Sequence, residues 1–383
     1  MKNKDKFSNR IYGLVSYYGD LYKISNKEDF PEMIGPHVEK VYMSDYQYIQ
    51  YKSARKTELE ESKRKYRGEV GRFGAAKSAA STYRVRSRQL SNYAFPKHSI
   101  VEFNKKGQPS KADISKIEEK ELKDPKFSTK VAKVVSNLAK HENQPGIIYS
   151  QFVHGEGLEI VAAVLGAYGY KQYEPNVYDI KGSGKTYAII SGDIDTELRA
   201  KYISDFNKPE NKDGSIINVL LLSGTVAEGI DLKRCRHVHI LEPFWNYARI
   251  KQVITRAIRY KSHHDLEQKD RNVTVYIYVS IEPAELHKKV SKLKTMPEND
   301  PDVLELETTD MDLYNNSIKV MRLIDEFMLC LAESSIDCTN HNKNPDVHCK
   351  LCSPTNQQLF HPQLSKDMLL PNTCIPNKEK AVK

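Results

Sequence analysis

The feature that most constrains the fold is a regular alternation of short apolar runs and amphipathic segments between residues 146 and 280. The apolar runs have the length of strands, and the amphipathic segments carry apolar residues at helical spacing. Strands are expected at 146–153, 186–191, 215–223, 237–243 and 272–280, and helices at 155–170, 195–207 and 246–260. This alternation predicts an α/β fold with a parallel sheet covered by helices on both faces. In such sheets, ligand-contacting loops lie at the carboxyl ends of the strands.

Segments on either side of this alternation give weaker signals. Residues 10–19 mix β-branched and aromatic residues as a strand does, and residues 37–56 pass from a strand-like pattern into a helix. Residues 127–138 place apolar side chains on one helical face, and residues 313–335 read as a further helix. No internal repeat is evident.

The charge of the chain indicates a polyanionic partner. The sequence has 59 Lys and Arg against 50 Asp and Glu, a net charge of +9. Residues 54–88 alone carry 11 Lys and Arg against 4 Glu, a local excess of +7, so most of the imbalance lies in one basic stretch. No run of about 18 apolar residues and no apolar signal core is present, which predicts a soluble, intracellular protein.

The run "GSGKT" at 182–186 looks like part of a phosphate-binding loop. A complete loop reads G-x-x-x-x-G-K-[ST] and must leave a strand and open a helix. Here Asp179 occupies the position of the first glycine, and the residues after Thr186 have a strand pattern. We therefore expect Lys185 to lie in a basic turn that enters a strand rather than in an ATP site.

Residues 220–263 hold the stronger candidates for chemistry. The strand that ends at Ser223 leads into small and polar residues suited to phosphate, and a tight turn with carboxylates follows at 228–231. On the next helix, Arg249, Gln252, Arg256 and Arg259 are spaced three, four and three apart, which predicts one shared face. An arginine row beside such a turn suits the charge of a transferred phosphoryl group, whereas the alternative is a solvated basic face with a structural turn.

This block resembles motifs V and VI of superfamily 2 helicases and translocases. Motif VI reads Q-x-x-G-R-x-x-R in that superfamily and stands here as Gln252, Thr255, Arg256 and Arg259, with Thr255 in place of the usual glycine. The segment 241–259 looks closest to the branch shared by Swi/Snf-type ATPases and the helicase-like ATPases of large cytoplasmic DNA viruses, which includes the poxvirus early transcription factor small subunit and nucleoside triphosphatase. Residues 10–19, 83–96, 146–161, 187–207 and 334–338 fit the same viral group.

The resemblance implies a RecA-like C-terminal lobe, in which Arg256 and Arg259 act as arginine fingers and Gln252 helps to close the nucleotide cleft. It implies that Trp245 and Asn246 are structural, as an aromatic anchor and a helix cap. The remaining implied sites are a nucleotide-binding turn with Glu228, Gly229 and Asp231, and nucleic-acid contacts at Ser150, Gln151, Ser223, Gly224 and Thr225. The implied cofactor is ATP with Mg²⁺, and the implied track is a nucleic acid, with DNA favoured over RNA.

The first lobe of such enzymes supplies the phosphate loop and a D-E-x-x box, and neither occurs before residue 146. The chain is therefore expected to be half of an enzyme, inactive alone, that works with a separately encoded or lost N-terminal lobe in viral transcription or genome handling. It would then act in the host cytoplasm, in viral factories or in virions. The alternative is a stand-alone nucleic-acid-binding or regulatory module without ATPase activity.

The expected domain organisation has three parts. Residues 1–125 lead into the second lobe and contain the basic insertion 54–88, residues 126–290 form the RecA-like domain, and residues 300–383 form a C-terminal helix and tail. In the tail, Cys338, His341, Cys349 and Cys352 have the paired spacing of a structural zinc site, and His348 is an alternative to His341. Free or redox-sensitive thiols are the other interpretation.

Overall fold

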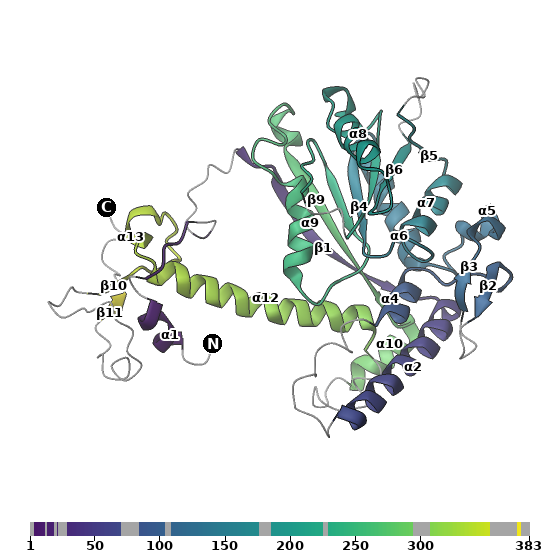
Figure 1. Ribbon diagram of the computed structural model, residues 1–383, viewed down its shortest axis with the longest axis horizontal. Coiled ribbons are helices and arrows are strands. Elements are labelled where there is room, and N and C mark those ends of the chain that lie inside the picture. Colours follow the sequence, from purple (N-terminus) through teal and green to yellow (C-terminus); the bar gives the residue numbers. More distant parts are fainter. Residues whose placement is uncertain are drawn as a thin grey trace. The chain divides into compact units, whose positions relative to one another are not determined.

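The computed structural model describes residues 4–11, 14–18, 21, 29–69, 84–103, 109–175, 185–224, 229–293, 307–352 and 374–376. By its internal contacts the chain divides into two compact units, one of residues 30–317 and one of residues 1–29 with 318–383. Figure 1 labels the elements of both units. Among the described helices, none combines the length and apolar character needed to cross a membrane.

A seven-stranded sheet forms the centre of the larger unit, in the order β1-β9-β8-β4-β7-β6-β5 (Figure 1). Its strands are β1 (Glu32–Tyr42), β4 (Gly146–Ser150), β5 (Lys171–Gln172), β6 (Thr186–Ile190), β7 (Val219–Ser223), β8 (His237–Ile240) and β9 (Asn272–Ile281). Every neighbouring pair is parallel. This confirms the parallel sheet predicted from the alternation. Between two parallel strands, a crossover returns the chain to the edge of the sheet at which the strands begin.

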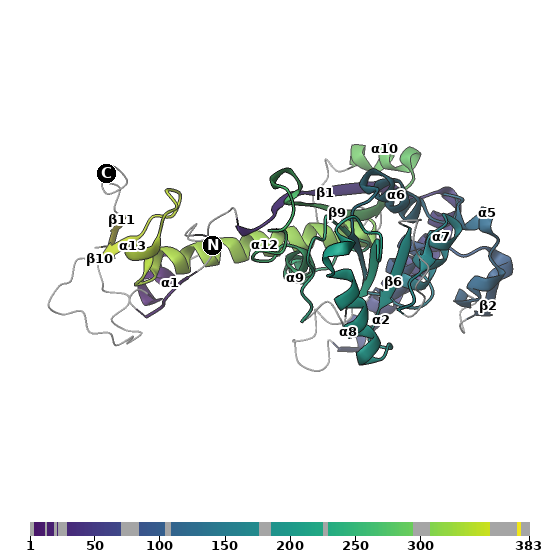
Figure 2. The ribbon, with the colours of Figure 1, turned by 90° about the horizontal axis from the view of Figure 1, so that it is seen from above.

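Two apolar cores lie on opposite faces of this sheet. Successive residues of a strand point to opposite faces, so Ile147 joins one core and Ile148 the other. Helices α8 (Thr196–Phe206) and α9 (Tyr247–Ala257) cover the first core, and α6 (Thr129–Leu138) and α7 (Leu158–Ala167) cover the second (Figures 1 and 2). The buried, continuously apolar strands are the direct reason that both faces need helices.

Further described elements surround the sheet. In the larger unit they are α2 (Asp45–Glu69), α4 (Val85–Asn92), β2 (Ile100–Phe103), β3 (Pro109–Ala112), α5 (Glu119–Leu122), α10 (Ala284–Leu293) and the start of α12 (Thr309–Ser334). The smaller unit contains the rest of α12 with α1 (Lys4–Ile11), α13 (Cys338–His341), β10 (Lys350–Cys352) and β11 (Cys374–Pro376). Strands β2 and β3 form an antiparallel hairpin. Helix α2 follows β1 directly, so the predicted passage from strand to helix over 37–56 is confirmed.

The main helices begin at polar caps that satisfy their free backbone N–H groups. The Ser128 side chain accepts from Val131 N at the start of α6, and the Asp195 carboxylate accepts from Glu197 N and Leu198 N at the start of α8. At the start of α9, Asn246 Oδ1 accepts from Ala248 N at 3.0 Å. The predicted helix cap at Asn246 is thus confirmed.

The strand expected over residues 10–19 is wrong. Helix α1 continues through Ile11, and the described residues 14–18 contain no strand. Tertiary contacts within the smaller unit explain the difference, because the Phe7 ring lies 4.6 Å from the Phe327 ring and Ser8 Oγ lies 3.2 Å from Cys330 Sγ. Both contacts require side chains that project from one side of a helix onto α12.

The zinc site expected at Cys338, His341, Cys349 and Cys352 is not supported. Cys338 and Cys349 form a disulfide, and a disulfide sulfur is not a thiolate ligand. The His341 ring lies edge-on to the Tyr18 ring, with centroids 5.8 Å apart. Across the described ranges, no group of three or more His, Cys, Asp or Glu side chains is arranged to hold a metal ion. The same disulfide corrects the expectation that Cys338 and Cys349 are reduced.

Candidate nucleotide and nucleic-acid site

Helix α9 connects two groups of predicted site residues. Arg249, Gln252 and Arg256 lie on the helix as expected, but α9 ends at Ala257, so Arg259 lies beyond it. The backbone of Ile258 leaves the helical region at φ −103° and ψ 80°. The prediction of one helical face is therefore right for three residues and wrong for the fourth. From Arg249 to Arg256 the helix rises about 10 Å, which separates the two groups.

The first group lies at the carboxyl-terminal end of α9. Arg259 Nε is 3.0 Å from Asp231 Oδ1, an ion-pair distance without hydrogen-bond alignment, and the two side chains are 41% and 72% exposed. Leu232 N donates to Arg256 O at 3.2 Å, which ties the segment after Gly229 to the end of the helix. An exposed ion pair contributes about 0–1 kcal/mol, so Arg259 can exchange Asp231 for another anion at little cost.

A glycine is required in the turn of this first group. Gly229 has φ +86°, a conformation that side chains with a Cβ rarely adopt. The structure thus brings Gly229, Asp231, Arg256 and Arg259 to one end of the helix, whereas Gln252 is exposed on its surface. Glu228 lies outside the described residues.

The second group lies at the carboxyl edge of the sheet. Ser150 ends β4 and Ser223 ends β7, and the two are direct partners in the strand register. Both side chains are buried, with exposed fractions of 0% and 1%, whereas Gln151 and Gly224 are partly exposed. Thr225 lies outside the described residues. The four described residues of the predicted nucleic-acid set therefore meet at one edge, and two of them lie below the surface.

A close approach explains the glycine at 224. A Cβ added there would lie 2.9 Å from Arg249 Nη2, closer than real Cβ contacts allow. Arg249 Nη2 donates to Gly224 O across 3.5 Å. The amino-terminal end of α9 is thus held against the loop that leaves β7, and Arg249 belongs to the sheet-edge group.

The buried carboxylate of Glu242 organises this edge. Glu242 follows β8, is 0% exposed, and accepts from Ser150 Oγ at 2.6 Å and from Gln151 N at 3.0 Å. Its third donor is Asn92 Nδ2 at 2.5 Å. Hydrogen bonds to a buried carboxylate are shorter and stronger than those between neutral groups. Glu242 therefore fixes the end of β4 and the start of its loop.

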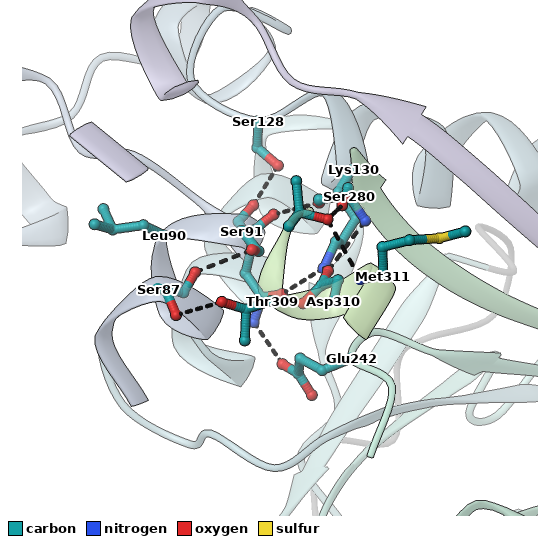
Figure 3. A network of polar contacts seen from close by, with 12 residues as sticks. Ser87, Leu90, Ser91, Ser128, Lys130, Glu242, Ser280, Thr309, Asp310 and Met311 are labelled. Carbon is teal, nitrogen blue, oxygen red and sulfur yellow. Dashed lines mark hydrogen bonds and ion pairs between the residues drawn. The ribbon is translucent and has the colours of Figure 1, made fainter. Parts of the chain in front are cut away.

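A second layer of polar contacts, which includes Lys130, Ser280 and Asp310 labelled in Figure 3, adjoins Asn92. Lys130 Nζ donates to Asn92 Oδ1 at 3.1 Å and forms an ion pair of 2.7 Å with Asp310 Oδ2, and both charged side chains are 0% exposed. The same Asp310 oxygen accepts from Ser280 N at 3.0 Å. The start of α12, the end of β9, α6 and α4 thus meet in one buried network beneath the sheet edge.

Helix α4 also contributes residues to this edge of the sheet, and the sequence signals did not assign it there. The segment 83–96 fits the viral pattern, but no role follows from its spacing. In the structure α4 supplies Asn92 to the Glu242 network and places the Arg88 guanidinium 5.1 Å from the Phe152 ring. The available signal was the alternation of arginine with small serines over 84–91, which permits one face to pack closely while the other carries charge.

The predictions for 182–186 and for Trp245 have different outcomes. Thr186 opens β6, and its buried hydroxyl donates to Ile216 O at 2.8 Å and accepts from Asn218 N at 3.1 Å. A strand and not a helix follows Lys185, so the expected strand is confirmed, whereas residues 182–184 of the run lie outside the described residues. Trp245 is 41% exposed beside Phe244, so the anchor role expected for it is wrong.

Comparison with known proteins identifies the class to which this fold and site belong. Residues 129–261 match the model of the helicase conserved C-terminal domain. That range includes α6, the central strands, the sheet edge and α9 with both arginines. The chain therefore contains a helicase C-terminal domain, built as a RecA-like parallel sheet.

Its relatives include viral helicase-like proteins. The termination factor NPH-I homolog of African swine fever virus (isolate Pig/Kenya/KEN-50/1950) is 31% identical, over 100% of this chain and 56% of that protein. A putative ATP-dependent RNA helicase (R563) of Acanthamoeba polyphaga mimivirus is 32% identical, over 74% of this chain and 45% of that protein. The chain thus spans about half the length of the curated relatives that it matches.

Among solved structures, the C-terminal part of the Fun30 ATPase domain overlaps with a TM-score of 0.45 at 15% identity, covering 76% of this chain and 99% of that chain.

Proposed function

We propose that this chain supplies the second lobe of a viral superfamily 2 ATPase that moves along nucleic acid. The observation that carries the proposal is the division of polar residues between the two ends of α9. Arg256, Arg259 and the Gly229–Asp231 turn meet at one end, and the strand-end residues of β4 and β7 meet at the other. A lobe of this kind links nucleotide chemistry to a nucleic-acid contact through one rigid helix.

Arg256 and Arg259 would act as the arginine fingers. The residues present fit a phosphate, because the Arg259 guanidinium lies beside the turn of Gly229 and Asp231, and the Asp231 carboxylate that pairs with it is exposed. Arg256 is tied to the same turn by the hydrogen bond from Leu232 N to its backbone carbonyl. ATP with Mg²⁺ supplies the γ-phosphoryl group that is transferred to water. Gln252 lies between the two arginine-bearing ends on the exposed face and would help to close the cleft. The phosphate loop and the D-E-x-x box would come from a first lobe, since neither stands in this sequence.

The nucleic-acid contacts would come from Gln151, Gly224 and Thr225 at the carboxyl edge. Ser150 and Ser223 are buried in the same edge, so in this proposal they hold the loops that carry the contacts. DNA is the favoured track. The word "termination factor" in the name of the African swine fever virus relative supports a role in viral transcription.

Substitution of Arg259 tests the proposal. The chain is joined to a first lobe from the same source, and ATP turnover is measured with and without DNA. Arg259→Ala should lower turnover by about a thousandfold, the range of arginine fingers, with unchanged affinity for DNA. Lys251→Ala, on the same helix and exposed, is the matched control and should keep full turnover.

Three outcomes contradict parts of this account. Wild-type turnover in Arg259→Ala removes the arginine-finger role. ATP turnover by the chain alone that disappears in Lys185→Ala would overturn the need for a first lobe. If the first lobe restores no turnover while the chain still binds DNA, the chain is a binding module without ATPase activity.

A further inference from the structure

A buried arginine without an ion-pair partner lies under the carboxyl edge of the sheet. Arg88 is 4% exposed, and its Nε and Nη2 atoms have no hydrogen-bond partner among the residues that the structure describes. Its guanidinium carbon lies 5.1 Å from the Phe152 ring and 5.9 Å from the Phe244 ring. The charge is therefore in contact with aromatic rings and with no carboxylate in the described ranges.

A second arginine faces the same ring. The Arg249 guanidinium carbon lies 5.0 Å from the centre of Phe244, so the two guanidinium groups are at most about 11 Å apart. Arg249 is partly exposed, and its hydrogen bond to Gly224 O is long at 3.5 Å. Gln151, from the same edge, has a buried Nε2 that also finds no partner within the described residues. Unused donors thus gather around Phe152 and Phe244.

Two other buried cations of this unit have partners for their charge, whereas Arg55, 7% exposed, has an Nε atom without a hydrogen-bond partner among the described residues. Arg236, 8% exposed at the amino edge, donates from Nε, Nη1 and Nη2 to Asn272 and Asp270 at 3.1 to 3.2 Å. Lys130 is paired with Asp310. A buried charge without a partner destabilises the folded state, and a cation–π contact offsets only part of that cost. Arg88 differs from Arg236 and Lys130 in this respect, and a ligand of opposite charge would explain the difference.

We propose that Arg249 and Arg88 form a phosphate-binding site for the backbone of the nucleic-acid strand, with Arg249 in direct contact and Arg88 as a buried positive charge beneath it. This inference rests on the proposed function and adds two residues to its nucleic-acid set. A phosphate bound by Arg249 would lie next to Gly224 and within reach of the field of Arg88, which water screens little because it is buried. A phosphodiester fits because the site offers charge and N–H donors without base-specific groups.

The test uses the full chain and a labelled DNA duplex two helical turns long. Affinity is measured over a range of salt concentrations, with an RNA duplex of the same sequence as a second probe. Arg249→Met should weaken binding to DNA about tenfold and lower the slope of log affinity against log salt by about one. Arg88→Met should also weaken binding, but with an unchanged or raised melting temperature, because it removes an unpaired buried charge.

Two further variants separate charge from packing. Arg88→Lys keeps the charge and should keep more of the affinity than Arg88→Met. Arg236→Met changes the net charge equally and removes a paired buried arginine, so it should lower the melting temperature and leave the affinity for DNA unchanged. If Arg88→Met does not fold, the Arg249→Met result decides the matter, since Arg249 is partly exposed.

The outcomes distinguish this inference from the proposed function. If the wild-type chain binds neither duplex, the proposed function fails and the inference with it. If the wild-type chain binds DNA while folded Arg249→Met and Arg88→Met bind equally well with the same salt slope, only the phosphate site is overturned. If the chain binds the RNA duplex as tightly as the DNA duplex, the phosphate site still holds. The preference for DNA in the proposed function is then wrong.

Discussion

At the amino edge of the sheet the buried polar groups pair with one another, whereas at the carboxyl edge several buried donors lack partners in the described residues. His237 at the start of β8 uses both ring nitrogens, toward His239 Nε2 and Gln144 O, each at 3.0 Å. Arg88 and Gln151 at the other edge leave donors unused. Unpaired buried groups lower stability, so this difference agrees with the phosphate site proposed at the carboxyl edge.

The carboxyl edge nevertheless depends on the buried ion pair of Lys130 and Asp310, and breaking that pair should have the largest effect on stability. Asp310→Ala leaves Lys130 charged, 0% exposed and bound only to Asn92 Oδ1. The free energy of unfolding should fall by about 3–5 kcal/mol, the usual cost of removing one partner of a buried ion pair. Urea unfolding followed by Trp245, the single tryptophan, measures it.

Two control variants accompany this prediction. Replacing both partners, as Lys130→Met with Asp310→Leu, should recover most of the loss, because no buried charge then remains. Glu267→Ala breaks a surface pair whose side chains are 73% to 75% exposed and should cost less than about 1 kcal/mol. A loss in Asp310→Ala as small as that of Glu267→Ala would show that the network does not support the edge.

The second largest effect is expected from acid, which should lower the free energy of unfolding through buried histidines at the amino side of the sheet. Burial lowers the pKa of His237 to about 3 and that of His263 to about 4, below the usual 6.5. Below pH 6.5 the unfolded chain takes up protons that the folded chain does not. The free energy of unfolding should therefore fall with pH between about 6.5 and 4, approaching about 1.4 kcal/mol per pH unit for each histidine.

Unfolding midpoints in urea at a series of pH values test this. His263→Gln should reduce the slope by the share of one histidine, and the exposed His264, substituted in the same way, serves as the matched control and should leave it unchanged. A slope that stays the same in His263→Gln would mean that this residue takes up its proton equally in both states.

The smallest effect is expected at Lys185, the residue that looks most like part of an ATP site in the sequence. Its ammonium lies 6.0 Å from the Tyr170 ring and its side chain is exposed. Lys185→Ala should change the free energy of unfolding by less than about 0.5 kcal/mol, as surface substitutions usually do. ATP turnover of the two-lobed enzyme should also be unchanged, and a strong loss of turnover would place phosphate chemistry at the amino edge.

Local pattern was sufficient for the elements of the sheet domain. Apolar runs at 219–223 and 272–281 and the helical spacing in α9 are recorded in neighbouring residues, so strands, helices and the cap at Asn246 could be predicted. The carboxyl ends of β4 and β7 then had to meet, because parallel strands share an edge. The sequence by itself determined the fold class, the sheet edge and the residues that reach it.

Only the tertiary structure decided which of those residues face a ligand and which are held in the interior. Ser150 is committed to Glu242, and Arg259 leaves the helix to meet Asp231. The pairing of Lys130 with Asp310 joins residues 180 positions apart, and no periodic pattern records such a partner. Burial and long-range pairing depend on how the whole chain packs, and they decide whether a polar side chain stabilises the fold or remains available for binding.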